Sequence, residues 1–145
     1  RDKLIPFKKK LTLSQIGRVG HEFFIRTGRK PFFNYCAGEH NIEHSDAFHL
    51  YNKFSPVVWN ATVSVICEQN DGMSTSSDKQ KLLAEVFSNR LVAMGFDVRV
   101  FDPAGQTTIG GGCGQLWATQ RWFNDNPDKC RPSIGHGMIK IHKHS

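Results

Sequence analysis

A chain of 145 residues is long enough for one domain with a hydrophobic core, and 39% hydrophobic with 22% charged residues is ordinary for a soluble globular protein. It contains no run of about 18 consecutive apolar residues, so we expect no membrane-spanning segment. The formal net charge of +6 favours anionic partners such as nucleic acids, although a solvated basic surface would give the same charge.

The first predicted helix covers residues 12–27, with a capping box of Thr12 and Gln15 at its start and Gly28 at its end. A strand is expected over residues 31–36 and a second helix over residues 45–54. The first helix should bury one apolar face, at steps of three and four residues, made of Leu13, Ile16, Val19, Phe23 and Phe24.

Residues 57–67 are rich in β-branched side chains and give the strongest strand prediction. A helix should follow the capping box of Ser77 and Gln80, then a strand over residues 97–102, and a short helix from Cys113 to about Phe123. The apolar face that the helix after Ser77 should bury against the core consists of Leu82, Leu83, Val86, Phe87, Leu91 and Met94.

Strands that alternate with helices in this way indicate repeated βαβ units. We therefore predict an α/β fold with a parallel sheet, either a small open domain or part of a (β/α) barrel. Functional residues in such folds gather at the carboxyl ends of the strands. Three polar loops, beginning at Cys36, Cys67 and Asp102, should share that edge of the sheet.

The stretch Gly110-Gly111-Gly112-Cys113-Gly114-Gln115-Leu116 is the sharpest local motif. Glycines permit unusual backbone angles, and a cysteine near a helix start has a thiolate favoured by the helix dipole. The motif therefore predicts a reactive thiol at Cys113. A phosphate-binding glycine loop, or a packing loop with an incidental thiol, remains the alternative.

Four cysteines, at positions 36, 67, 113 and 130, form no CxxC pair, which favours reduced thiols in a cytoplasmic protein over a disulfide framework. Cys36, His40 and His44 could meet around zinc, with His49 nearby, but Gly38 breaks the helical spacing that this requires. We therefore expect no metal site in the chain. The aromatic residues Trp117, Trp122 and Phe123 could stack on bases, although packing of the helix face is the favoured interpretation.

Three segments, in order, resemble the second half of the RlmN/Cfr family of radical SAM RNA adenine methyltransferases. Residues 1–10 (RDKLIPFKKK) are similar to the family's RDKLMPINKK, and residues 63–70 (VSVICEQN) to its INLIPWN strand. Residues 109–116 (IGGGCGQL) are similar to its ID(A)ACGQL loop. The resemblance implies that Cys113 carries a methyl group and that Asn70 contacts S-adenosylmethionine.

The fold implied by the resemblance is the C-terminal part of a radical SAM (β/α) barrel over residues 1–125, with a methyl-carrier loop at 103–114 and a basic tail at 126–145. The implied reaction methylates an sp² carbon of adenine through an S-methylcysteine, using S-adenosylmethionine and a [4Fe–4S] cluster. A CxxxCxxC motif for that cluster is absent from the sequence. The cluster would therefore belong to a missing N-terminal half of a longer protein, and this chain alone should be inactive.

The implied partner is RNA, either rRNA or tRNA, which the basic residues Lys8, Lys9, Lys10, Arg29 and Lys30 would contact. Two other interpretations stay open. The chain could be a non-catalytic RNA-binding α/β module, or a small thiol or metal protein that uses Cys36, Cys113 and the histidines.

Overall fold

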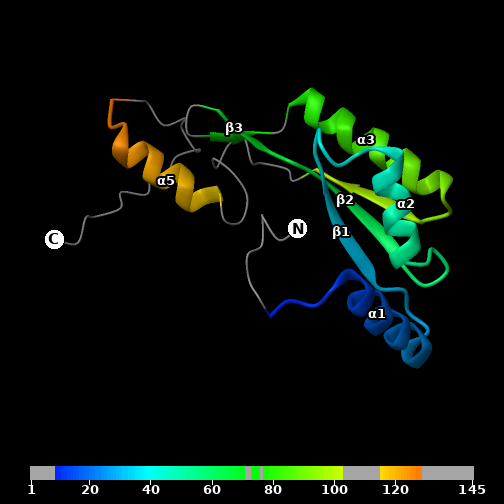
Figure 1. The fold of residues 1–145 in the computed structure, drawn as a ribbon. Coiled ribbons are helices and arrows are strands. Elements are labelled where there is room, and N and C mark those ends of the chain that lie inside the picture. The colour runs from blue at the N-terminus through cyan, green and yellow to red at the C-terminus, as the bar shows by residue number, and fades with distance from the viewer. Residues whose placement is uncertain (1–8, 71–72, 76, 103–114, 129–145) are drawn as a thin grey trace.

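The computed structural model describes residues 9–70, 73–75, 77–102 and 115–128. Four helices and five strands follow one another within these residues (Figure 1). In chain order they are α1 (Leu13–Thr27), β1 (Phe32–Ala37), α2 (His44–Lys53), β2 (Asn60–Val65), β3 (Glu68–Asn70), β4 (Met73–Thr75), α3 (Asp78–Ala93), β5 (Val98–Phe101) and α5 (Gln115–Asp125).

The centre of the fold is a parallel sheet in the order β1-β2-β5, which confirms the predicted βαβ arrangement. Strand β1 pairs with β2 from Phe32 opposite Asn60 to Ala37 opposite Val65. Strand β5 pairs with the other side of β2, with Ser64 opposite Phe101 at one end. Helices α2 and α3 lie together on one face of this sheet (Figure 1).

The core lies between that face and the helices. Strand β2 contributes Ala61, Val63 and Val65, and α3 contributes Ala84, Phe87 and Leu91. An aromatic cluster closes the end of the core beside the amino ends of β1 and β5. Phe33 stacks on Phe54 with 5.0 Å between ring centroids, and Phe96 meets Phe33 edge-on with 5.5 Å between centroids. Leu82, expected on the buried stripe of α3, is exposed, whereas the polar Gln80 and Ser88 lie on the buried side. The buried Ser88 hydroxyl has a hydrogen-bond partner, because it donates to the Ala84 carbonyl at 2.7 Å.

Helix α1 has the predicted caps, with a reciprocal capping box between Thr12 and Gln15 and Gly28 in the left-handed conformation at φ 67°. Its predicted buried face is wrong in part, because Val19 and Phe23 are 54% and 44% exposed. Leu13, Ile16 and Phe24 do pack against the core. The closest approach is made by Gly17 and Gly20, which lie against the Lys53 carbonyl and the Trp59 indole. Two glycines let the backbone approach its neighbours more closely than larger side chains would allow.

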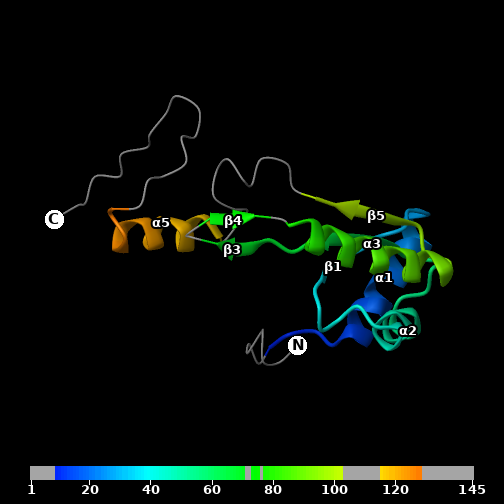
Figure 2. The same ribbon diagram turned by 90° about the horizontal axis from the view of Figure 1, so that it is seen from above.

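The strand predicted over residues 57–67 is shorter, from Asn60 to Val65, because residues 56–58 form a turn. The amides of Val58 and Trp59 donate to the Ser55 carbonyl at this turn. The chain then enters a small antiparallel hairpin of β3 and β4, with Asn70 opposite Met73. Both views show this hairpin and α5 displaced to one side of the three-stranded sheet (Figures 1 and 2). Asn70 therefore belongs to the hairpin and does not end a strand of the main sheet.

Several predictions concern residues outside the described part. They include Cys113, the methyl-carrier loop at 103–114, and the tail beyond residue 128. The final described helix covers Gln115–Asp125, and its predicted start at Cys113 lies outside the described residues. Among the described helices, none has the length and apolar character needed to cross a membrane.

Candidate functional site

The carboxyl ends of β1, β2 and β5 lie along one edge of the sheet because the three strands are parallel. We call this the carboxyl edge; it comprises residues 36–43, 66–67 and 102. The structure thus brings together the first residues of the three polar loops predicted from the sequence, beginning at Cys36, Cys67 and Asp102.

The loop after β1 is closed by the Asn41 side chain. Its Oδ1 accepts a hydrogen bond from the Gly38 amide at 2.7 Å, and its Nδ2 donates to the Cys36 carbonyl at 3.0 Å. A side chain at position 38 would crowd the neighbouring strand end, since a Cβ there would lie 3.1 Å from Ile66 Cδ1. The amide of Asn41 and the absence of a side chain at Gly38 therefore set the shape of this loop.

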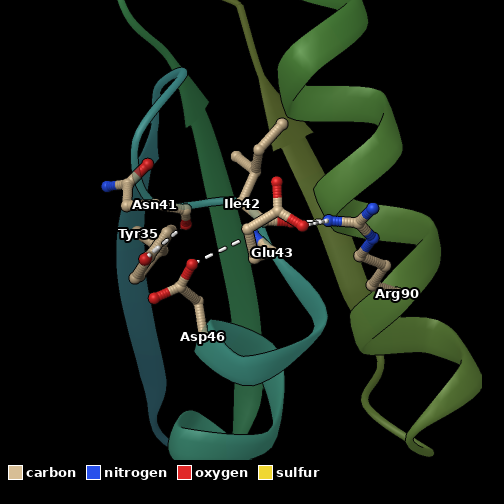
Figure 3. A network of polar contacts seen from close by, with 6 residues as sticks. All are labelled: Tyr35, Asn41, Ile42, Glu43, Asp46 and Arg90. Carbon is tan, nitrogen blue, oxygen red and sulfur yellow. Dashed lines mark hydrogen bonds and ion pairs between the residues drawn. The ribbon is translucent and has the colours of Figure 1, made fainter.

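A second set of polar contacts ties the same loop to β1 and α3 (Figure 3). The Tyr35 hydroxyl donates to the Asn41 carbonyl at 2.7 Å, and the Arg90 guanidinium donates to the Ile42 carbonyl. Arg90 also lies 3.9 Å from a carboxylate oxygen of Glu43, whose amide donates to Asp46 at 2.9 Å. The loop is held from both sides, so it forms a fixed wall of the carboxyl edge.

Burial, and secondly the negative charge of Asp46, raise the pKa of Tyr35 from 10.0 to about 12. Its phenol in the unfolded chain ionises near pH 10, so the stabilisation it contributes is complete below that pH and is lost as the pH rises through about 12. We expect Tyr35→Phe to show a smaller fall in the free energy of unfolding between these two pH values than the wild type. Urea titrations across this range measure the difference. Tyr51→Phe, at an exposed position of α2, should keep the wild-type profile, and an unchanged profile in Tyr35→Phe would contradict the assignment.

Ion pairs attach the first turn of α3 to the carboxyl edge. Lys79 pairs with Glu39, whose pKa is lowered by that hydrogen bond and charge, and Lys81 lies 3.3 Å from Asp102. Both pairs are exposed to solvent and contribute little to stability. Burial and the charge of Asp102 raise the pKa of the Cys67 thiol. Cys67 is therefore kept in its protonated, weakly nucleophilic form.

The face of the sheet opposite α2 and α3 carries polar side chains. Because Phe33, Tyr35 and Ala37 point to the helices, the alternate residues of β1 point the other way, and the strand register places partners from β2 and β5 beside them. No helix of the described part covers this face. We call it the open face; it consists of Phe32, Asn34, Cys36, Thr62, Ser64, Arg99 and Phe101.

Hydrogen bonds join the three strands across the open face. The Ser64 hydroxyl donates to Asn34 Oδ1 at 2.7 Å, and Arg99 Nε donates to the Thr62 hydroxyl at 2.8 Å. The Arg99 guanidinium also lies over the Phe32 ring, 4.6 Å from its centroid. Asn34 and Arg99 are exposed on this face, whereas Thr62 and Ser64 of the central strand are buried between them.

The sequence prediction missed the open face. Its signal is the alternation in β2, where the apolar Ala61, Val63 and Val65 are interleaved with Thr62 and Ser64. A strand buried on both sides reads as continuously apolar, whereas this alternation is typical of a strand with one polar face. In a (β/α) barrel that second face points to the barrel interior.

The predicted RNA-contacting residues fall into separate places. Lys9 and Lys10 precede α1, whereas Arg29 and Lys30 follow it, so the 15-residue helix separates the two pairs by roughly 22 Å. Lys30 donates to the Pro56 carbonyl at 2.9 Å, near the amino end of β2 and away from the carboxyl edge. Lys8 and Cys113 lie outside the described residues. For Asn70 the structure describes the backbone but not the side chain.

No three His, Cys, Asp or Glu side chains within residues 9–70, 73–75, 77–102 and 115–128 are grouped so that they could hold a metal ion. The structure therefore does not bring Cys36, His40 and His44 together as a zinc site. Neither Cys36 nor Cys67 forms a disulfide bond within the described residues.

No protein-family profile and no curated protein matches the sequence. A crystal structure of a radical SAM methyltransferase from Sphaerobacter thermophilus is similar, with a TM-score of 0.64 at 19% sequence identity. The match covers 81% of this chain, which spans 34% of the length of that protein. The chain therefore has an α/β fold with a three-stranded parallel sheet, as in part of a radical SAM (β/α) barrel.

Proposed function

We propose that this chain is the C-terminal part of a radical SAM RNA methyltransferase, which methylates an sp² carbon of adenine through an S-methylcysteine at Cys113. The observation that carries the proposal is the parallel sheet whose polar open face ends at the carboxyl edge, in a fold shared with a radical SAM methyltransferase. The similarity of residues 1–10, 63–70 and 109–116 to the RlmN/Cfr family supports the finer assignment to RNA and adenine.

In this proposal Cys113 accepts the methyl group. Its thiolate sulfur forms a bond to the methyl carbon of S-adenosylmethionine while the bond from that carbon to the sulfonium sulfur breaks, which releases S-adenosylhomocysteine. The proton of the thiol has gone to solvent beforehand. Glycines on both sides of Cys113 in the sequence leave room for a large substrate to approach the main chain. Cys67 is a poor alternative, because its pKa is raised.

The exposed Asn34 amide and Arg99 guanidinium of the open face are the proposed polar contacts to S-adenosylmethionine, and the buried Ser64 and Thr62 hydroxyls hold these two side chains in place. Asn70 is the proposed further contact, reached from the β3–β4 hairpin. Lys8, Lys9, Lys10, Arg29 and Lys30 are the proposed contacts to RNA phosphates. Their separation along α1 requires an RNA that extends over the helix.

The residues present do not suit a [4Fe–4S] cluster. The four cysteines of the sequence are too widely spaced for a CxxxCxxC motif, and no metal-binding group of three occurs in the described part. We therefore place the cluster in a longer parent protein, together with the strands that would complete the barrel. The chain by itself is then expected to be inactive.

The test is peptide mapping by mass spectrometry of the parent protein purified from cells that supply S-adenosylmethionine. We expect one additional methyl group on the peptide that contains Cys113, and its complete loss in Cys113→Ala. The matched control Cys67→Ala should keep the methyl group on Cys113. A wild-type protein with unmodified Cys113 would refute the proposed role of this residue.

A non-catalytic RNA-binding module is the second candidate, favoured by the absence of cluster ligands from the sequence. It predicts that Cys113 carries no methyl group and that Cys113→Ala binds RNA as tightly as the wild type. The same mapping experiment, combined with RNA titration of both proteins, separates the two candidates.

A further inference from the structure

Helix α5 has one packed side and one side open to solvent. Thr119 and Phe123 are buried, and Trp122 meets the Phe123 ring edge-on at 5.1 Å. Trp117 is 69% exposed, although tryptophan is among the side chains that gain most from burial. Residues 119 and 123 lie on the opposite side of a helix from residue 117. The helix therefore packs through Phe123, and Trp117 lies on the solvent side. The packing predicted for all three aromatic residues therefore applies to Phe123 and not to Trp117.

The exposed indole is accompanied by a cation. The Arg121 guanidinium lies 5.5 Å from the centroid of the Trp117 ring, and Arg121 Nε lies 3.9 Å from a carboxylate oxygen of Asp125. These three residues follow one another at steps of four along the solvent side of α5. The guanidinium lies over one face of the indole ring, and both side chains are largely exposed to solvent.

A nucleobase with its phosphate has complementary features, because the base stacks on an aromatic ring and the phosphate attracts a guanidinium. The residues 129–145, which follow α5 in the sequence, contain two lysines and one arginine between 129 and 140, a further lysine at 143, and neither Asp nor Glu. On the described solvent side of α5, the neighbours of Trp117 are polar (Arg121, Asn124, Asp125) and do not extend it into an apolar patch of the kind that binds proteins. Charge and polarity therefore favour a nucleic acid as the occupant.

We propose that Trp117 and Arg121 form a stacking platform for an unpaired base of a single-stranded RNA segment. The choice of RNA rests on the proposed function, whereas the platform itself rests on the geometry of α5. Trp117 is four residues from Cys113, and four residues of chain span at most about 14 Å. The stacked base would therefore lie within a few nucleotides of the target adenine. The platform would hold this part of the RNA close to the proposed methyl carrier, Cys113.

The experiment measures fluorescence anisotropy of a labelled single-stranded oligoadenylate titrated with the chain at several salt concentrations. We expect Trp117→Ala to weaken binding about fivefold to a hundredfold, which is the range for the loss of one base stack. The slope of affinity against salt should stay at the wild-type value, because no phosphate contact of Trp117 is removed. Trp117→Phe should retain most of the affinity, since a phenyl ring also stacks.

Phe48→Ala, which removes an exposed aromatic ring from α2, is the matched control and should bind like the wild type. Wild-type affinity in Trp117→Ala, with weaker binding in Lys9→Ala/Lys10→Ala, would overturn the platform and leave the proposed RNA substrate standing. Failure of the wild-type chain to bind the oligonucleotide at any salt concentration would count against both the stacking platform and the proposed RNA substrate. A change in sedimentation without a change in RNA affinity for Trp117→Ala would make Trp117 a protein contact and overturn the platform.

Discussion

Phe87→Ala should lower the free energy of unfolding by about 4 kcal/mol, the typical cost of removing a fully buried phenyl ring. The Phe87 side chain has no exposed surface and lies on the face of α3 that packs against all three strands of the main sheet. Its ring stacks on Tyr35 with 4.6 Å between centroids, so the substitution leaves a cavity beside the residue that holds the Asn41 carbonyl. The loss therefore extends to the wall of the carboxyl edge.

Urea denaturation followed by circular dichroism measures the loss of stability, and hydrogen exchange of the Gly38 amide measures the local effect. We expect faster exchange at Gly38, because its bond to Asn41 depends on a loop that Tyr35 helps to hold. Val92→Ala, at an exposed position of the same helix, should change stability by less than about 0.5 kcal/mol. A similar cost for both substitutions would show that Phe87 is not a core residue.

Gly20→Ala is expected to destabilise the protein by about 2 kcal/mol, although alanine is intrinsically the better helix former by about 1 kcal/mol. The net effect on stability is opposite to this helix preference, because a Cβ at position 20 would overlap the indole ring of the buried Trp59. Either α1 moves away from the end of the sheet or the Trp59 ring leaves the aromatic cluster around Phe33 and Phe54. Both responses lose buried contacts.

Thermal unfolding monitored by circular dichroism gives the sign of the effect. Trp59→Phe makes room for the added methyl group, so the double variant should be more stable than the sum of the two single effects. His21→Ala, at the neighbouring exposed position, is the control and should be nearly neutral. A stabilising Gly20→Ala would mean that α1 does not pack closely on Trp59.

The predictable parts of the fold depend on interactions within a few residues. The start of α1 at Thr12 and its end at Gly28 follow from side-chain and backbone hydrogen bonds that the local sequence specifies. The three parallel strands follow from an aromatic run in β1 and from β-branched residues in β2 and β5, with helical segments between them. By contrast, β3 and β4 have three residues each, too few for an alternating pattern, and the Asn70-Asp71-Gly72 turn signal was the available hint.

The candidate site was predictable to a smaller extent. The parallel sheet explains why the loops beginning at Cys36, Cys67 and Asp102 share an edge. The open face was missed because Asn34, Thr62 and Arg99 are far apart in the sequence and become neighbours through the strand register. The roles of Cys113 and Asn70 stay predictions that come from the resemblance to a family.

The sequence by itself determined where the helices and the three strands of the main sheet lie and that this sheet is parallel, because caps, turns and periodicity act over short distances along the chain. The tertiary structure decided which side of each element is covered. It buried Gly20 and Phe123 while it exposed Val19 and Trp117, and it left Asn34 and Arg99 exposed on the sheet face that no described helix covers. Burial depends on which distant elements pack together, and two apolar residues on one helix look alike until a neighbour covers one of them.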